Sequence, residues 1–177
     1  HATSHLTSEM FENHDKSQFE IYGFYLGSKV SENDIWHKKL KKSFKEFYFV
    51  REMSDQEICK LAKDINIDIA IDLMTHCTNG MENRFGVFAR RCAPIQINFL
   101  GYPGTSGSKS IDYIIADKTV IPEKYKKFYS ENIVYLPNSY QPNSKQTQIS
   151  NKKFSKEDFN LPNDKFIFCC FNQHQKI

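Results

Sequence analysis

The sequence predicts an α/β protein in which short strands alternate with helices around a parallel sheet. Short apolar runs, rich in β-branched and aromatic side chains, recur along the chain. Segments with helical spacing of their apolar residues separate these runs. The composition, 40% hydrophobic and 25% charged, is that of an ordinary globular domain and excludes collagenous, coiled-coil and wholly disordered chains. Because alternating strands and helices favour parallel pairing with right-handed crossovers, we expect a Rossmann-like sheet with flanking helices.

The elements expected first come from aromatic and amphipathic patterns. Residues 19–25 are aromatic-rich and predict a first strand, residues 31–42 repeat apolar side chains at helical spacing, and residues 46–50 predict a second strand. Ser54 and Glu57 have the spacing of a capping box, in which each side chain binds the other residue's backbone amide. A helix is therefore expected to begin at Ser54.

The middle of the chain supplies the remaining strands of the first domain. Residues 68–73 form a nearly continuous apolar run, which is typical of a strand buried on both faces of a parallel sheet. Residues 83–91 predict a short helix that ends in two arginines, a favourable charge at a helix C-terminus. Further strands are expected at residues 94–100, 111–115 and 133–136.

A polar stretch divides the chain into two parts. Residues 138–153 are rich in Asn, Gln, Ser and Lys and have the composition of a linker. A helix start at Ser155 and an apolar strand at 166–171 follow. We expect residues 1–148 to form the Rossmann-like domain and residues 149–177 to hold the linker and the first strand of another. Since the chain begins at His1 and stops soon after a strand, it is interpreted as an internal piece of a longer protein.

Charge, cysteines and hydropathy narrow the functional classes. No apolar run approaches the roughly 18–20 residues of a membrane span, so a soluble chain without a membrane partner is expected. The five cysteines have no regular spacing, which favours a reducing, cytoplasmic compartment over a disulfide framework. The net charge is +3, and the only dense basic cluster is residues 38–45. A solvated helix face explains this cluster better than a phosphate-binding patch, and no nucleic-acid partner is expected.

Three loops lie where a parallel sheet binds ligands, beyond the carboxyl ends of strands. They cover residues 74–80, 101–107 and 172–176. The loop 101–107, called here the glycine loop, contains three glycines and Pro103, and such backbone can point amides at ligand oxygens. A plain tight turn is the alternative. His76 in the first loop is a candidate base or hydrogen-bond donor, or an ordinary surface histidine.

Basic and polar residues at the two ends of the chain are further candidates. Gln173 and Lys176 would share a face if a helix begins there, and a lysine at a helix N-terminus suits a diphosphate. An ordinary exposed lysine is the alternative. His1 and His5 have the spacing of a zinc pair, but the glutamate and third ligand of a metalloprotease are missing, so no metal is expected.

The loops taken together resemble a known family. Residues 93–107 (A-P-I-Q-x-x-F-L-G-Y-P-G-T-S-G) and 112–117 (D-Y-I-I-A-D) strongly resemble the O-linked N-acetylglucosamine transferases. That family includes the plant SPINDLY proteins and bacterial members with tetratricopeptide repeats. Further landmarks in the family's order are residues 1–6, 88–94, 129–131, 136–143 and 168–177.

The resemblance implies the N-terminal lobe of a two-lobed GT-B glycosyltransferase. The family's reaction is inverting and metal-independent, and transfers N-acetylglucosamine from UDP-N-acetylglucosamine to Ser or Thr of an acceptor protein. The resemblance implies that no cofactor is needed. It also implies that tetratricopeptide repeats lie upstream and that a C-terminal lobe makes most of the donor site. A chain of this length is therefore expected to be inactive alone.

The resemblance also assigns site residues. His1, His76 and Lys176 match catalytic positions: His1 lies near the acceptor hydroxyl and donor sugar, and Lys176 meets the diphosphate. The substrate-binding matches are Thr78, Leu100, Gly101, Pro103 and Gln173. Leu100, Gly101 and Pro103 line the sugar pocket and Gln173 meets the nucleotide. Cys77 is an alternative to Thr78, because the loop after His76 is longer than is usual in the family.

Two other functions are compatible with the sequence. A sibling transferase could use another sugar, such as glucose or fucose, or modify Asn. A non-catalytic module could retain nucleotide or protein binding without turnover.

Overall fold

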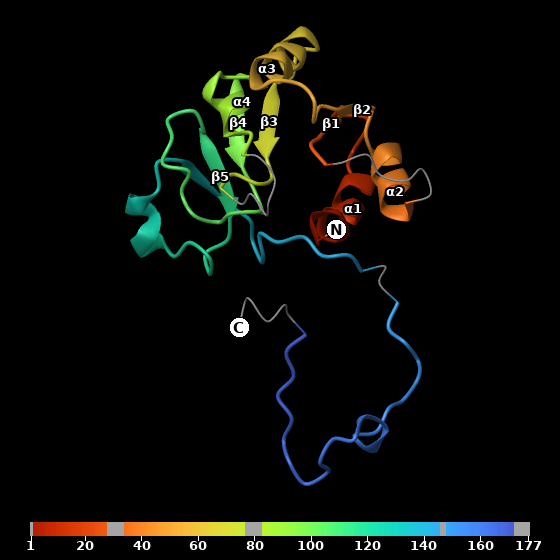
Figure 1. Cartoon of the computed structure of the whole chain (residues 1–177). Coiled ribbons are helices and arrows are strands. Elements are labelled where there is room, and N and C mark those ends of the chain that lie inside the picture. Colours follow the sequence, from red (N-terminus) through yellow and green to blue (C-terminus); the bar gives the residue numbers. More distant parts are fainter. Residues whose placement is uncertain (1, 28–33, 77–82, 146–147, 172–177) are drawn as a thin grey trace. The chain divides into compact units, whose positions relative to one another are not determined.

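The computed structural model describes residues 2–27, 34–76, 83–145 and 148–171 (Figure 1). The chain divides into two compact units, His1–Lys145 and Gln146–Ile177. The first unit holds helices α1 (Ala2–Glu12), α2 (Ile35–Ser43), α3 (Asp55–Asp64) and α4 (Phe85–Ala89) and the 3₁₀ helix η1 (Glu123–Phe128). Its strands are β1 (Tyr22–Tyr25), β2 (Glu46–Phe49), β3 (Ile69–Asp72), β4 (Ile95–Asn98), β5 (Tyr113–Ala116) and β6 (Asn132–Tyr135).

All paired strands that the structure describes run parallel, which confirms the predicted α/β class. The strands form two sheets, one with the order β1-β2 and one with the order β3-β4-β5-β6. In the larger sheet Asp72 of β3 lies opposite Asn98 of β4, which lies opposite Ile114 of β5. The ends of β3 and β4 are therefore level, and the loops that follow them emerge side by side.

Helix α3 begins where its capping box predicts. The Ser54 hydroxyl accepts the backbone N–H of Glu57 at 3.3 Å, and the Glu57 carboxylate accepts the N–H of Ser54 at 2.7 Å. These two bonds satisfy amides that have no partner within the helix. The buried face of α3 packs into a core cluster with Val50 and residues of α4.

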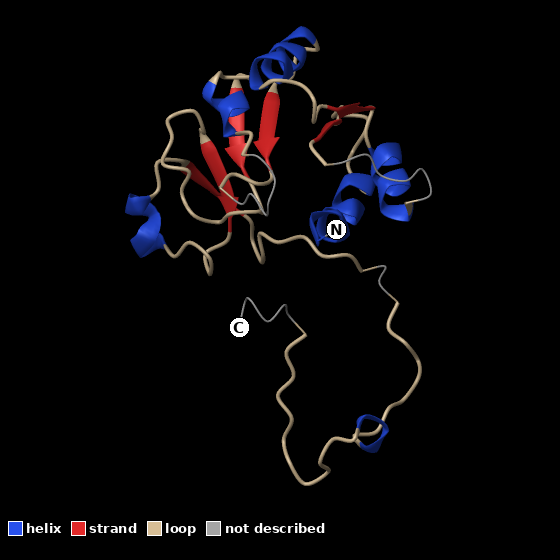
Figure 2. Cartoon of the chain, in the orientation of Figure 1, coloured by secondary structure: helices blue, strands red, loops and turns tan. Residues whose placement is uncertain are grey.

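A fully buried glutamine connects α4 to the larger sheet. The Gln96 side chain of β4 donates to the carbonyls of Phe88 at 2.9 Å and Ser110, and accepts the N–H of Cys92 at 2.9 Å. Each of its polar atoms is paired, so its burial costs little free energy. Figure 2 shows α4 next to the strands of this sheet.

Strand β3 is not buried on both faces, contrary to the sequence prediction. Ala70 packs against the cluster of α3 and α4, but Ile69 and Ile71 on the opposite face are 46% and 48% exposed. By register, this open face continues through Ile95 of β4 and Tyr113 of β5, which are also exposed. Helices α3 and α4 pack on the Ala70 side of the strand, and neither hydrophobic cluster among the described residues includes Ile69 or Ile71.

Helix α1 is absent from the sequence prediction. Its buried side chains include Thr7 and Ser8, so its apolar periodicity is weak. The helix packs against α2, where the rings of His5 and Trp36 have centroids 4.0 Å apart. Lys39, from the basic cluster 38–45, forms an ion pair with Glu12 at 3.1 Å.

The second unit has little regular structure. The helix start predicted at Ser155 produces one turn of 3₁₀ helix, η2 (Glu157–Phe159), which ends where Asn160 turns left-handed at φ 53°. The strand predicted at 166–171 is wrong, because these residues form no ladder and the second unit is drawn without any strand in its described part (Figure 2). Phe166 and Phe168 are 82% and 91% exposed. An apolar run becomes a strand only when a neighbouring strand supplies hydrogen bonds, and the described part of this unit holds no other strand. None of the described helices has the length and apolar character needed to cross a membrane.

Candidate active site

Half of the predicted site residues can be placed. His76, Leu100, Gly101 and Pro103 belong to the described part of the chain, whereas His1, Thr78, Gln173 and Lys176 lie outside the described residues. The four that are placed come from the loops after β3 and β4. Two of the three loops singled out in the sequence thus meet at one edge of the larger sheet.

The loop after β3 starts with a turn held by Asp72. The buried Asp72 carboxylate accepts the backbone N–H groups of Met74 at 2.9 Å and Thr75 at 3.0 Å. Thr75 has a left-handed backbone with φ 47°, which is rare for a β-branched residue and costs on the order of 1–3 kcal/mol. The hydrogen bonds that Asp72 accepts from Met74 and Thr75 offset this cost, and the turn presents His76 directly beyond the strand.

Asn98, at the end of β4, joins the two loops. Its side chain is fully buried and its oxygen accepts the Thr75 hydroxyl at 2.5 Å. Its amide group donates to the carbonyls of Tyr102 at 3.1 Å and Gly104 at 3.3 Å. One side chain therefore fixes the β3 loop and the glycine loop against each other.

Gly101 occupies a position where no larger residue fits. A Cβ atom there would lie 2.2 Å from the carbonyl oxygen of Leu73 and 3.1 Å from the Cα of Met74. The sequence predicts a close backbone approach at this loop, and the structure shows that the backbone approached is the end of β3. The preceding Leu100 is buried and left-handed, with φ 75°.

His76 contacts the glycine loop and leaves much of its ring exposed. Its Nε2 lies 3.2 Å from the carbonyl oxygen of Ser106. Because a carbonyl only accepts, Nε2 is the donor and carries the hydrogen. Rings of Phe85 and Tyr102 flank the imidazole at 5.9 and 5.4 Å. In the neutral ring, Nδ1 is then the nitrogen without a hydrogen and can accept a hydrogen bond.

Residues just before β6 hold the glycine loop from its other side. The Tyr129 hydroxyl donates to the carbonyl of Pro103 at 3.0 Å. The buried Glu131 carboxylate accepts the Thr105 hydroxyl and the Ser106 N–H, both at 2.7 Å. Burial raises the pKa of Glu131, but the hydrogen bonds from Ser106 and Thr105 outweigh burial and keep the pKa below its ordinary value. The side chain is therefore ionised at neutral pH.

Asp72, Asn98 and Glu131 are not among the predicted site residues. A carboxylate or amide at the end of an apolar strand was the available signal for Asp72 and Asn98. For Glu131 only the family landmark 129–131 drew attention to the position, since nothing in the spacing places it beside the glycine loop.

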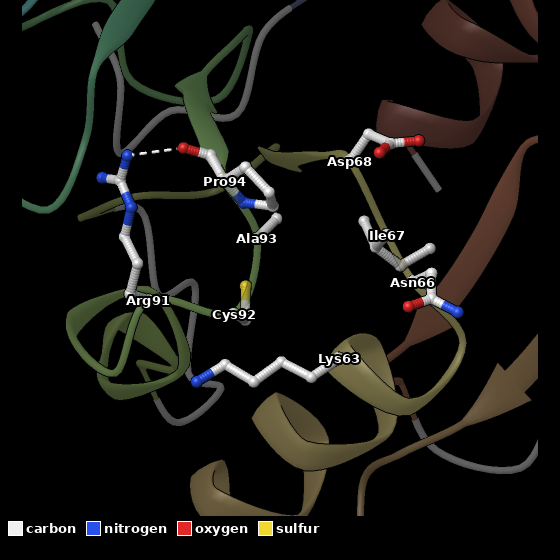
Figure 3. Close-up of a pocket in the computed structure, with 8 residues that line it drawn as sticks. All are labelled: Lys63, Asn66, Ile67, Asp68, Arg91, Cys92, Ala93 and Pro94. Atoms are coloured by element: carbon white, nitrogen blue, oxygen red, sulfur yellow. Dashed lines mark hydrogen bonds between the residues drawn. The ribbon is translucent and has the colours of Figure 1, made fainter.

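A pocket in the described part of the chain lies at the opposite edge of the sheet. Its volume is about 370 Å³, and its lining residues are Lys63, Asn66, Ile67, Asp68, Arg91, Cys92, Ala93 and Pro94 (Figure 3). Asp68 and Pro94 directly precede β3 and β4, so the pocket faces the amino ends of these strands. The pocket is therefore separate from the loops beyond the carboxyl ends.

Two chemical groups of this pocket, the Arg91 guanidinium and the Cys92 thiol, are already engaged. The Arg91 guanidinium donates to both carboxylate oxygens of Asp112 at 2.8 Å and to the Pro94 carbonyl at 2.6 Å. Burial, followed by the nearby Cys59, raises the pKa of the Cys92 thiol to about 11, so the thiol stays protonated and is a poor nucleophile at neutral pH. Among the described residues, no group of three or more His, Cys, Asp or Glu side chains could hold a metal ion.

The fold and the two loops agree with comparisons to known proteins. The model of glycosyl transferase family 41 matches residues 1–154. A probable UDP-N-acetylglucosamine–peptide N-acetylglucosaminyltransferase SEC of Arabidopsis thaliana is 35% identical over all of this chain, which spans 18% of that protein. A UDP-N-acetylglucosamine–peptide N-acetylglucosaminyltransferase of Caenorhabditis elegans is 33% identical over 79% of this chain and 12% of its own length.

A solved structure has the same fold. The O-GlcNAc transferase of Thermobaculum terrenum, solved as a K341M mutant, superposes with a TM-score of 0.73 and 28% identity, covering 80% of this chain and 26% of its own. This match confirms the expected fold class, a parallel sheet with flanking helices from the GT-B catalytic region. On the extent of the family match, and with the loops placed as described, the chain belongs to glycosyl transferase family 41.

Proposed function

We propose that this chain forms the N-terminal lobe of an inverting, metal-independent glycosyltransferase. The enzyme would transfer N-acetylglucosamine from UDP-N-acetylglucosamine to Ser or Thr side chains of proteins, in the cytoplasm and beside upstream tetratricopeptide repeats. The observation that carries the proposal is the junction of His76 with the glycine loop at the carboxyl edge of the larger sheet. Parallel α/β sheets bind their ligands at this edge, and two relatives of the chain are named as UDP-N-acetylglucosamine–peptide N-acetylglucosaminyltransferases.

The donor site requires more residues than this lobe supplies. The chain spans less than a fifth of the length of the curated relatives it matches. We propose that a second lobe completes the site and that Gln173 and Lys176 contribute to the nucleotide and diphosphate contacts. On this proposal the 177-residue chain is inactive by itself.

The proposed reaction is a direct displacement at the anomeric carbon. The acceptor oxygen attacks from the face opposite the leaving group, and the new carbon–oxygen bond forms as the bond to the β-phosphate oxygen breaks. UDP leaves with the electron pair, and the Lys176 ammonium would neutralise its developing charge, which replaces the need for a metal. His1 would take or relay the proton of the acceptor hydroxyl. Leu100, Gly101 and Pro103 would line the sugar pocket, with His76 and Thr78 beside it.

A transfer assay tests the proposal. The full-length product of the gene is incubated with radiolabelled UDP-N-acetylglucosamine and a Ser/Thr-containing acceptor peptide, with and without EDTA, beside the 177-residue chain. We expect EDTA-resistant label and a β-linked product by NMR for the full-length protein, and none for the chain alone. Transfer by the chain alone would contradict the two-lobe requirement, and an α-linked product would contradict inversion.

A donor panel separates the alternatives. The same assay with UDP-glucose and GDP-fucose identifies a sibling transferase if either donor is used in preference to UDP-N-acetylglucosamine. Donor binding measured by calorimetry without any transfer would identify a non-catalytic module. Lys176→Ala in the full-length protein should lower transfer by orders of magnitude, and unchanged transfer would remove Lys176 from the leaving-group role.

A further inference from the structure

Glu131 is a buried carboxylate whose partners are all neutral. The residue is 5% exposed and directly precedes β6. Within the part of the chain that the structure describes, it forms no ion pair with a lysine or arginine. Burying an unpaired charge is costly unless hydrogen bonds replace its hydration. The hydrogen bonds that this carboxylate accepts must therefore compensate for its burial.

Among the described residues, all of the side-chain hydrogen bonds of Glu131 come from the glycine loop. Oε1 accepts the N–H of Ser106 at 2.7 Å and also its hydroxyl, and Oε2 accepts the hydroxyl of Thr105 at 2.7 Å. Hydrogen bonds to a charged acceptor are about twice as strong as those between neutral groups. Because one carboxylate binds two consecutive loop residues, it fixes both the position and the orientation of that part of the loop.

The neighbours of Glu131 extend this attachment. Thr105 Oγ1 accepts the N–H groups of Ser130 at 3.2 Å and Gly107 at 3.1 Å while it donates to Glu131. The Tyr129 hydroxyl holds the carbonyl of Pro103. Three consecutive residues before β6 thus bind three residues of the glycine loop.

The attachment continues across the loop to His76. Ser106 donates its N–H to Glu131 on one side and offers its carbonyl to His76 Nε2 at 3.2 Å on the other. A displacement of Ser106 would therefore move the carbonyl oxygen that holds the hydrogen of His76 on Nε2. Glu131 itself is buried beneath the loop residues that it binds, so its carboxylate is not exposed to a ligand.

We propose that Glu131 is a positioning residue that holds the glycine loop in its sugar-binding conformation. It acts through Thr105 and Ser106 and does not touch the substrate. The sugar-binding role of the loop rests on the proposed function. That Glu131 fixes the loop, called here the mechanical part of the proposal, can be tested without measuring activity. Both parts are tested by Glu131→Gln, which preserves the shape of the side chain and removes its charge.

Hydrogen–deuterium exchange of the 177-residue chain tests the mechanical part. In Glu131→Gln we expect faster exchange of the amides of residues 105–107 and unchanged exchange in β3 and β4. Glu123→Gln is the matched control: it makes the same substitution in the same β5–β6 connection, where Glu123 is exposed and forms an ion pair with Lys126 at 3.7 Å. Wild-type protection of the loop in a folded Glu131→Gln protein would overturn the proposal.

A second pair of variants keeps the test decisive if Glu131→Gln does not fold. Thr105→Val removes the hydroxyl that binds Glu131, and Thr105→Ser retains it. We expect loss of loop protection in the valine variant and restoration in the serine variant. Equal protection in the two variants would overturn the proposal.

Kinetics of the full-length protein test the positioning part. We expect Glu131→Gln to lower kcat/KM for the donor on the order of 100-fold, the scale of about 1 Å misplacement of binding groups, through a raised KM, with the KM for the acceptor peptide unchanged. Glu123→Gln should match the wild type. An active wild type with an unaffected donor KM in Glu131→Gln would overturn the inference and leave the proposed function intact. An inactive wild type would instead overturn the proposed function, and the exchange result alone would then decide whether Glu131 positions the loop.

Discussion

Three buried polar side chains, Asp72, Asn98 and Glu131, determine the course of the chain at the candidate active site. Each accepts backbone or hydroxyl hydrogens from loop residues that follow a strand. Buried polar groups are costly unless they are fully paired, and paired networks favour one arrangement over others. The left-handed backbone of Thr75 and Leu100 lies between these anchors. At the residue scale, the site is thus held by polar bonds and close backbone contacts.

The lowered pKa of Glu131 predicts a pH-dependent contribution to stability. A carboxylate with a folded-state pKa below its ordinary value of 4.5 stabilises the fold above that value, and the contribution is lost as pH falls through the folded-state pKa. We expect the difference in unfolding free energy between wild type and Glu131→Gln to be largest near pH 7 and to shrink below about pH 4. Urea denaturation at both pH values measures it. A difference that grows on acidification would contradict the assignment.

Two glycines of the same loop should respond differently to alanine. A Cβ at Gly101 would meet the Leu73 carbonyl oxygen at 2.2 Å, whereas a Cβ at Gly107 meets nothing within 4 Å but has φ +67°. We expect Gly107→Ala to cost about 1 kcal/mol of stability from backbone strain alone. Gly101→Ala should cost more and should also displace the loop from β3. Urea denaturation and loop amide exchange measure the two effects, and equal costs would refute the close approach at Gly101.

At the scale of elements, α3 is the helix that the local sequence specifies most completely. Its first turn is closed by the reciprocal bonds of Ser54 and Glu57, and its buried face packs against α4. The 3₁₀ turn η2 shows the contrast: Ser155 and Asp158 exchange similar bonds, yet the helix ends after three residues. The difference is that α3 has a core to pack against, and packing supplies most of the stability of a short helix.

Removal of the α3 cap should lower stability measurably. We expect Ser54→Ala to cost about 1 kcal/mol, because the N–H of Glu57 loses its acceptor and Glu57 loses its orientation. Gln56→Ala, an exposed position in the same turn, is the control and should change stability by less than about 0.5 kcal/mol. The measurement is urea denaturation with an unchanged m-value. A cost equal to that of the control would mean that the capping box contributes nothing.

At the scale of the whole molecule, the two units differ in how they are stabilised. All the described strands and both hydrophobic clusters belong to the first unit. The second unit consists of one short 3₁₀ helix and irregular chain with exposed phenylalanines. The core that governs unfolding of the chain is therefore within residues 1–145.

Deletion of residues 146–177 should leave the unfolding of the first unit almost unchanged. We expect the melting temperature of the shortened chain to lie within about 2 °C of that of the full chain, equivalent to less than about 1 kcal/mol. Ile114→Ala, at a core position 1% exposed, is the sensitivity control and should cost about 2–5 kcal/mol. Differential scanning calorimetry measures both. A large drop on deletion would show that the second unit stabilises the first.

Short patterns in the sequence were enough to predict most of the helices and strands and to identify the family. Short apolar and aromatic runs, the Ser54 capping box and the motif of residues 93–107 each consist of residues close together in the sequence. The sequence alone therefore predicts the α/β class and the positions of six strands. Helix α1 escaped prediction because Thr7 and Ser8 fill its buried face. The segment 166–171 was mispredicted because an apolar run resembles a strand even when no neighbour pairs with it.

Tertiary structure alone decided which faces are covered and which distant residues share the site. The exposure of Ile69 and Ile71 depends on where α3 and α4 pack, and that choice is made by the whole core. The attachment of Glu131 to Thr105 and Ser106 joins residues 26 and 25 positions apart, a separation at which no sequence periodicity carries information. The sequence by itself predicted the candidate residues of the glycine loop, and the folding of β4, β5 and β6 into one parallel sheet determined which side chains hold that loop in place.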